Sequence, residues 1–206
     1  MNARETAFIF IEFQNDFCSA GGKLHSSLMN ELQRNHTLQN ARRLLEGARK
    51  KDCLVIHCPF ILDKEWVTQN ECTGILSGIL ENQIFVPDTW GQAIIDSMKP
   101  EDGEVLLEHK HALSAFTNTN LDEILSLAGI QNLIICGFLT NICVQATAFS
   151  AYDRGLKTRI ALDACGAATK EIQNFMEENL PSLLGGKSTV DEILSGIQEV
   201  YDSSPA

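Results

Sequence analysis

Residues 133–148, LIICGFLTNICVQATA, join an apolar run to a short polar turn and then to the start of a helix. The run at 133–136 has the pattern of a fully buried strand, and Val144 and Ala148 have the spacing of a helix's core face. Cys143 is therefore expected in the first turn of that helix, above the carboxyl end of a central strand. This position predicts a lowered thiol pKa and a nucleophile, although a free cysteine is also commonly a small buried hydrophobic residue.

The composition predicts one globular domain over residues 1–206. Of these residues 44% are hydrophobic and 21% are charged, and the formal net charge is −11, which is typical of a soluble domain. The negative charge argues against a nucleic-acid partner or a polybasic membrane contact, and no apolar run reaches the roughly 18 residues of a membrane span. The seven cysteines form no C-x-x-C pair and the N-terminus lacks a signal-peptide pattern. We therefore expect a cytoplasmic protein without disulfides.

Strand and helix patterns alternate along the chain, which indicates an α/β fold with a parallel sheet covered on both faces. The expected strands are at 7–13, 53–58, 104–108, 133–136 and 157–162. The expected helices are at about 28–50, 121–128, 143–154, 169–179 and 190–199, the last capped by Ser188 or Thr189.

The segment 59–103 departs from this alternation. It joins two expected strands, holds both tryptophans and three of the five prolines, and has a helix pattern only near 90–98. Long connections at the carboxyl edge of a sheet are often binding loops. We therefore predict that residues 59–103 form a substrate lid.

Three expected strands lead to groups that could react together. The first strand ends in Glu12, the third is followed by Lys110, and the fourth leads to Cys143. A carboxylate, an ammonium group and a thiol on one edge of a sheet suffice for nucleophilic acyl transfer. From spacing alone, a structural salt bridge between Glu12 and Lys110 is at least as good an interpretation.

The same three places carry longer motifs. EFQNDF at 12–17 has the form acid-x-Gln-x-Asp-Phe, KHALSAF at 110–116 has the form Lys-x-x-x-Ser-x-Phe, and GFLTNICVQATA at 137–148 has the form Gly-x-x-Thr-x-x-Cys-Val-x-x-Thr-Ala. In these motifs, and in the strand that ends in ALDA at 161–164, the chain resembles the isochorismatase-like cysteine hydrolases. The resemblance spans residues 7 to about 170, in the family's order.

This resemblance implies a three-layer αβα domain with a doubly wound, mostly parallel sheet of six strands in the order 3-2-1-4-5-6. The first and fourth strands are then neighbours at the topological switch point, where a ligand crevice is expected. It also implies a cis peptide bond between Phe138 and Leu139, an oxyanion hole from the N–H groups of Leu139 and Cys143, and substrate contacts from Phe17, Phe138 and Thr140. Family members are commonly dimers or tetramers, so a homo-oligomer is expected.

The resemblance gives the three groups their roles. Cys143 is the nucleophile, Glu12 is the general base, and Lys110 holds both in register. The implied reaction cleaves a C–N bond of a small amide or carbamoyl substrate through a thioester. Nicotinamidases of this family bind a metal through an Asp-x-His and a further His after the second strand. This chain has HCPF at 57–60 and no Asp-x-His follows, so we expect no metal and no other cofactor.

One residue departs from the family pattern. The acid is normally Asp, and here it is Glu12, which is one methylene longer. Since proton transfer needs heavy atoms within about 2.6–3.2 Å, the extra length must be absorbed locally. The alternative to a cysteine amidohydrolase is thus a catalytically weak or silent relative that binds a ligand or partner. Asp16 is the nearby alternative acid, but its place in the motif favours hydrogen bonds to the loop backbone.

Overall fold

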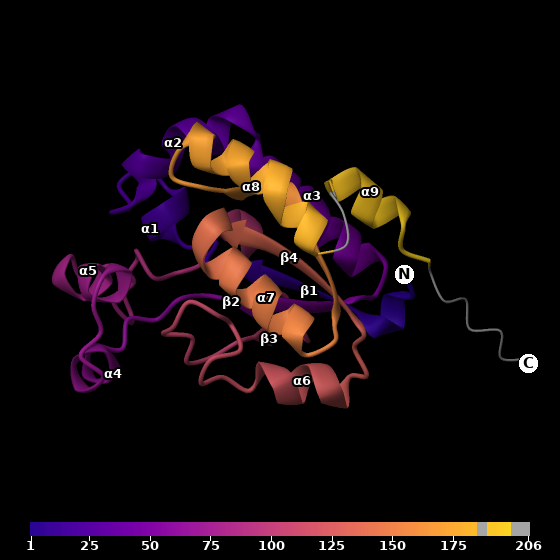
Figure 1. The fold of residues 1–206 in the computed structure, drawn as a ribbon, viewed down its shortest axis with the longest axis horizontal. Coiled ribbons are helices and arrows are strands. Elements are labelled where there is room, and N and C mark those ends of the chain that lie inside the picture. Colours follow the sequence, from indigo (N-terminus) through magenta and orange to yellow (C-terminus); the bar gives the residue numbers. More distant parts are fainter. Residues whose placement is uncertain (185–188, 199–206) are drawn as a thin grey trace, which may run out of the picture.

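The computed structural model describes residues 1–184 and 189–198. Within these residues five strands form one parallel sheet in the order β3-β2-β1-β4-β5 (Figure 1). The strands are β1 (Thr6–Ile11), β2 (Leu54–Cys58), β3 (Val105–Leu106), β4 (Asn132–Phe138) and β5 (Lys157–Gly166). The predicted parallel sheet and the order of these strands are confirmed.

Helices cover both faces of the sheet, which confirms the predicted three layers. α2, α3, α8 and α9 lie on one face and α6 and α7 on the other, while α4 and α5 project from one end of the molecule (Figure 1). The helices are α1 (Asn15–Cys18), α2 (His25–Arg34), α3 (Thr37–Lys50), α4 (Lys64–Gln69), α5 (Ile75–Glu81), α6 (Leu121–Leu127), α7 (Gln145–Asp153), α8 (Lys170–Leu183) and α9 (Val190–Ser195).

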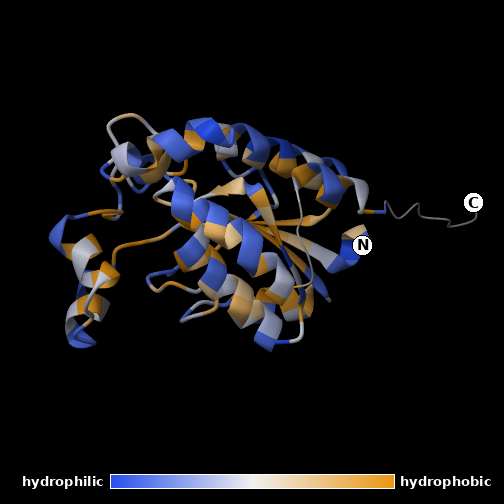
Figure 2. Cartoon of the chain, turned by 45° about the horizontal axis from the view of Figure 1, so that its top comes forward, coloured by the Kyte–Doolittle hydropathy of each residue, from blue (hydrophilic) through white to orange (hydrophobic). Residues whose placement is uncertain are grey.

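The two central strands are apolar because both of their faces are covered. Every residue of β1 and of β4 is buried, as the near-continuous hydrophobic runs of parallel strands require. Figure 2 shows the apolar strands inside and the polar faces of the helices outside. Gly137 lets β1 and β4 approach closely, because a Cβ there would lie 2.0 Å from the Ile11 carbonyl oxygen, and its φ is +128°. This close approach is at the carboxyl end of the switch point.

Two local expectations need correction. The helix expected at 28–50 is two helices, α2 and α3, because His36 has the left-handed φ of 50° and breaks the helical path between them. The strand expected at 104–108 is only Val105–Leu106, although the Leu107 N–H still donates to the His57 carbonyl (2.8 Å). Short edge strands limit the exposed edge of a sheet.

The helix expected near 90–98 is also wrong. There the backbone pairs with the loop after β1, since the N–H groups of Asn15 and Asp16 donate to the carbonyls of Ala93 and Gly91 (2.9 Å each). Only a short 3₁₀ turn, Asp96–Met98, remains. The helices of the long connection lie earlier, in α4 and α5.

The sixth strand implied by the resemblance is not among the five that the described residues form. Beyond α9, Gln198 makes an isolated parallel bridge to Asn2, and residues 199–206 lie outside the described residues. The expected cap at Thr189 is present as a capping box with Glu192, while Ser188 lies outside the described residues. Across the helices that the structure describes, none has the length and apolarity of a membrane span.

Candidate active site

Glu12 follows directly on the carboxyl end of β1, at the switch point. Its backbone has a φ of 60°, and its N–H donates to the Cys58 carbonyl at the end of β2 (3.0 Å). The residue is only 2% exposed. A carboxylate this deeply buried is costly unless a partner compensates for its charge.

That partner is Lys110, in the loop after β3. Its ammonium group contacts Glu12 Oε1 directly, donates to the Ala112 carbonyl (2.9 Å) and lies 4.7 Å from the centroid of the Phe60 ring. The Lys110 side chain is fully buried. Burial lowers the pKa of Lys110, but the negative charges that Cys143, Glu12 and Cys58 can carry outweigh it, and the net shift is upward. The Lys110 ammonium is therefore a permanent cation beside the carboxylate.

Cys143 lies in a π-helical turn, Thr140–Val144, that carries the chain from β4 into α7. Its expected lowered pKa is wrong. Burial raises the pKa of the thiol well above its ordinary value, and the negative charge of the Glu12 carboxylate raises it further, while the positive charge of Lys110 lowers it. A helix N-terminus would lower the thiol pKa, but this effect is outweighed because the sulfur is removed from water and lies near an anion. The resting thiol is protonated and needs a base.

A cavity of about 270 Å³ lies over these groups and is slightly smaller than typical ligand sites. Glu12 and Cys143 line it, together with the predicted residues Leu139 and Phe17. The peptide bond between Phe138 and Leu139 is cis. The carboxylate and the thiol are thus exposed to the same small space.

Two residues expected to contact substrate do not line this cavity. Phe138 is fully buried, with its ring centroid 5.1 Å from that of Phe13 and 5.7 Å from that of Phe17. The Thr140 hydroxyl turns toward α8 and donates to Gln173 Oε1 (2.7 Å). Both side chains support the turn that carries Cys143, because their neighbours are core residues and a buried amide.

The long connection 59–103, predicted to be a substrate lid, supplies part of the cavity's lining. Ile75, Gly78 and Ile79 of α5 line it, and Ile84 and Phe85 continue the apolar surface. Sequence patterns did not single these residues out. The available signal was the pair Ile75 and Ile79, whose i, i+4 spacing on a short helix predicts a shared apolar face.

Other lining residues were also missed. Leu24 and Ser27, at the start of α2, lie in a stretch for which no structure was predicted, and Leu113 and Ile142 are the variable positions of the lysine and cysteine motifs. Variable positions within a motif carry no chemical signal by themselves. Their role depends on which side chains the fold turns toward the sulfur.

The loop after β1 fastens the connection 59–103 to the sheet. The Gln14 side chain donates to the Phe60 and Gln92 carbonyls (2.8 and 2.7 Å) and accepts from the Phe60 N–H (2.7 Å). The Asp16 carboxylate accepts from the N–H groups of Phe85 (2.8 Å) and Lys23 (3.2 Å). Asp16 thus makes the loop-backbone hydrogen bonds that its motif position predicted, and Glu12 is the acid at the cavity.

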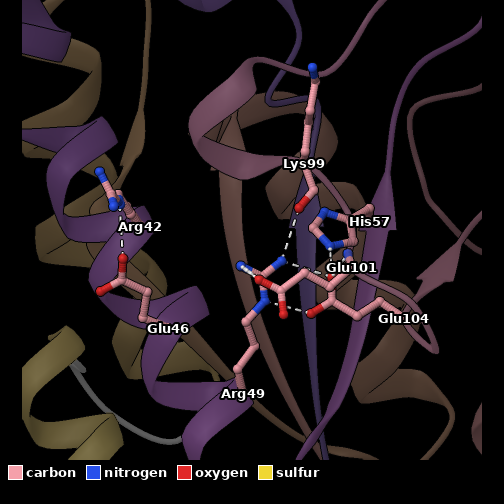
Figure 3. Close-up of polar contacts among 7 residues, drawn as sticks. All are labelled: Arg42, Glu46, Arg49, His57, Lys99, Glu101 and Glu104. Carbon is pink, nitrogen blue, oxygen red and sulfur yellow. Dashed lines mark hydrogen bonds and ion pairs between the residues drawn. The ribbon is translucent and has the colours of Figure 1, made fainter.

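A second buried polar cluster lies away from the cavity. His57 Nε2 is 2.8 Å from Glu104 Oε2, and Arg49 Nε donates to Glu104 Oε1 (2.7 Å), so the cluster links β2, α3 and the start of β3 (Figure 3). Burial lowers the pKa of His57. Burial raises the pKa of Glu104, but hydrogen bonds from Arg49, the Glu101 N–H and His57 bring it to about 2. These contacts identify His57 as a structural residue.

No group of three or more His, Cys, Asp or Glu side chains in the described part of the chain is arranged to hold a metal ion. The groups that remain for chemistry at the cavity are the thiol and the paired carboxylate.

Comparisons with known proteins bear on the family and the fold of the chain. The family model for the isochorismatase domain matches residues 6–190. The ureidoacrylate amidohydrolase RutB of Rhizobium rhizogenes is 29% identical over 95% of this chain and 84% of its own. The uncharacterized isochorismatase family protein YddQ of Bacillus subtilis is 30% identical over 82% of each chain. The crystal structure of a cysteine hydrolase from Pseudomonas syringae pv. phaseolicola superposes with a TM-score of 0.81 at 24% identity, covering 95% of this chain and 93% of that one.

Proposed function

The chain belongs to the isochorismatase domain family and is a hydrolase of that family, and from this premise we propose that it is a cysteine-dependent amidohydrolase. Its substrate is a small amide or carbamoyl compound, and it cleaves the C–N bond through a thioester. The observation that carries the proposal is the Glu12 carboxylate, which contacts the Lys110 ammonium and lines the same cavity as the Cys143 thiol.

The first half of the reaction forms the thioester. Glu12 takes the thiol proton, which it must do because the pKa of Cys143 is raised. The thiolate attacks the carbonyl carbon, and the N–H groups of Leu139 and Cys143 hold the oxyanion; each such donor typically contributes about 3 kcal/mol. Glu12 then gives the proton to the departing nitrogen as the C–N bond breaks. The products are a thioester on Cys143 and a free amine or ammonia.

The second half restores the enzyme. Glu12 removes a proton from a water molecule, whose oxygen attacks the thioester carbonyl. The tetrahedral intermediate collapses, the C–S bond breaks, and the proton returns from Glu12 to the sulfur. Lys110 holds the Glu12 side chain in place through both halves, because its buried ammonium group contacts the carboxylate directly.

The unusual glutamate favours the hydrolase over a silent relative. The longer side chain starts from a backbone with φ of 60°, and its carboxylate still contacts Lys110 and lines the cavity that Cys143 lines. The contact with Lys110 alone would suit the silent alternative. The shared cavity is what supports catalysis, because it gives the carboxylate and the thiol access to the same substrate.

The proposal extends to the setting of the enzyme. We take residues 1–206 as one domain that acts on a small molecule in the cytoplasm, as a dimer or tetramer. The seven cysteines, none of them in a disulfide, support a reducing compartment. The oligomer is expected from the family resemblance, and size-exclusion chromatography with light scattering measures it.

The test is an amide panel with ammonia release as the signal. It includes ureidoacrylate, an N-carbamoyl amino acid and uncharged primary amides, each with the wild-type protein, Cys143→Ala and Glu12→Asp. We expect turnover in the wild type that is lost in Cys143→Ala. Activity that survives in Cys143→Ala contradicts the mechanism, and activity that appears only in Glu12→Asp supports the silent alternative.

A further inference from the structure

The cavity beside Cys143 is lined mainly by apolar side chains. Of its fifteen lining residues ten are apolar, and Glu12 is the only charged one. Its remaining polar side chains are the Cys143 thiol, Ser27 and Asn82. Since Glu12 is already paired with Lys110, the lining offers no unpaired charge to a substrate.

The cations nearest the cavity among the described residues are already engaged. Lys110 is fully buried behind Glu12, with its ammonium also bonded to the Ala112 carbonyl. Lys23, beside the cavity residue Leu24, directs its ammonium to the carbonyls of Asn82 (3.0 Å) and Gln83 at the carboxyl end of α5. There it balances the negative end of the helix, and it is not a lining residue.

A carboxylate on the substrate would therefore meet mostly apolar side chains and no unpaired cation among the lining residues. Removing such a charge from water without compensation is strongly unfavourable. The net charge of −11 also repels an anion at long range. Ureidoacrylate, which the relative from Rhizobium rhizogenes hydrolyses according to its name, carries such a carboxylate.

We propose that this site takes an uncharged amide with a small apolar body, and that it discriminates against substrates bearing a carboxylate. The proposal rests on the amidohydrolase function and names its substrate class. The reacting carbonyl lies at Cys143, and the apolar body lies against Ile75 and Ile79 of α5. We assign specificity to these two residues because they line the cavity from α5, an element that carries none of the reacting groups.

The test compares two substrates that differ at one end. Hexanamide and adipamate have the same amide and the same methylene chain, but a carboxylate replaces the terminal methyl group in adipamate. We expect kcat/KM for ammonia release to be at least about 100-fold higher for hexanamide. Equal rates, or a preference for adipamate, would overturn the proposal.

Binding separates this inference from the chemistry. Isothermal titration of the two compounds into Cys143→Ala should give the same preference for hexanamide, whatever the turnover. If hexanamide binds preferentially and is not hydrolysed by the wild type, the substrate class stands and the amidohydrolase reaction fails. If the wild type hydrolyses other amides and hexanamide does not bind to Cys143→Ala, the substrate class fails and the reaction stands.

A cation placed in the cavity should reduce the discrimination. Ile75 is 42% exposed, so Ile75→Lys can fold with its ammonium at the opening. We expect the ratio of kcat/KM for adipamate over hexanamide to rise at least about tenfold. Leu127→Lys is the matched control, since Leu127 is 82% exposed on α6 and does not line the cavity. An unchanged ratio in Ile75→Lys, or an equal change in both variants, would contradict the assignment.

Discussion

Replacing Glu12 by Gln should make Cys143 more reactive and the enzyme less active. The pKa of Cys143 is raised by burial first and by the Glu12 carboxylate next, while Lys110 lowers it. Glu12→Gln removes the anion and leaves the cation, so the thiol pKa falls. The variant also lacks the general base, and losing such a group typically costs about 10²–10⁴-fold in rate.

The same substitution should lower stability. The Lys110 ammonium is fully buried and would keep only the Ala112 carbonyl, the Phe60 ring and a neutral amide. Breaking a buried ion pair costs about 3–5 kcal/mol. At about 2–4 °C per kcal/mol for a chain of this size, Tm should fall by roughly 6–20 °C.

Two assays read these effects separately. Alkylation of Cys143 by iodoacetamide at pH 7, followed by mass spectrometry of the labelled peptide, should be at least about tenfold faster in Glu12→Gln, while ammonia release is lost. Glu108→Gln is the control, because Glu108 lies two residues from Lys110 and its side chain is 76% exposed. Slower or unchanged alkylation in a folded Glu12→Gln would refute the electrostatic reasoning.

The remaining predictions concern the parts of the fold that hold the site. In the folded protein the pKa of His57 lies below its ordinary value, so the unfolded state binds more protons. Stability should therefore fall as pH drops below about 6.5. In a plot of urea midpoint against pH, His57→Gln should flatten this part of the curve, and an unchanged slope would exclude His57 as the cause of the fall. The Glu104 pKa of about 2 predicts a further loss as pH falls from about 4.3 toward 2, and this loss should be absent in Glu104→Gln. Gly137→Ala should lower the free energy of unfolding in urea by at least about 3 kcal/mol. Gly103→Ala should cost less, because Gly103 also has a positive φ but no atom lies within 4 Å of its added Cβ. Similar costs in the two variants would show that the positive φ, and not crowding by Ile11, determines the loss. Asp16→Ala should raise KM by about tenfold with a smaller change in kcat, because it frees the Phe85 N–H of the lid; a loss confined to kcat would contradict that role.

The chemical groups could be predicted from the sequence because each follows an apolar strand. Glu12 and Cys143 come after the two strands that read as most completely buried, and carboxyl ends of parallel strands share one edge. The role of Lys110 was predicted from its motif, and in the structure its ammonium group contacts the Glu12 carboxylate. Periodicity and strand-end chemistry are local properties, so they are visible in the sequence.

The features that the sequence did not predict depend on contacts between distant segments. The break at His36 is a backbone conformation that no residue pattern in that stretch specifies. The backbone at 91–93 pairs with Asn15 and Asp16 in place of forming a helix, and that competition cannot be judged within one segment. The raised pKa of Cys143 likewise follows from burial, which only the closed structure defines.

The hydrogen bonds that hold the connection 59–103 to the rest of the domain bear on where the chain can be cut. The segment that leads into α4 is held by the Ile61 N–H, which donates to the Lys110 carbonyl (2.9 Å). The segment that leaves α5 is held by the Phe85 N–H, which donates to the Asp16 carboxylate (2.8 Å). The turn between the helices is exposed, and a Cβ on Gly74 would meet no atom within 4 Å. Exposed turns of this kind tolerate new termini. A circular permutant that begins at Gly74, or two fragments divided there, should therefore reassemble the same cavity without the covalent link.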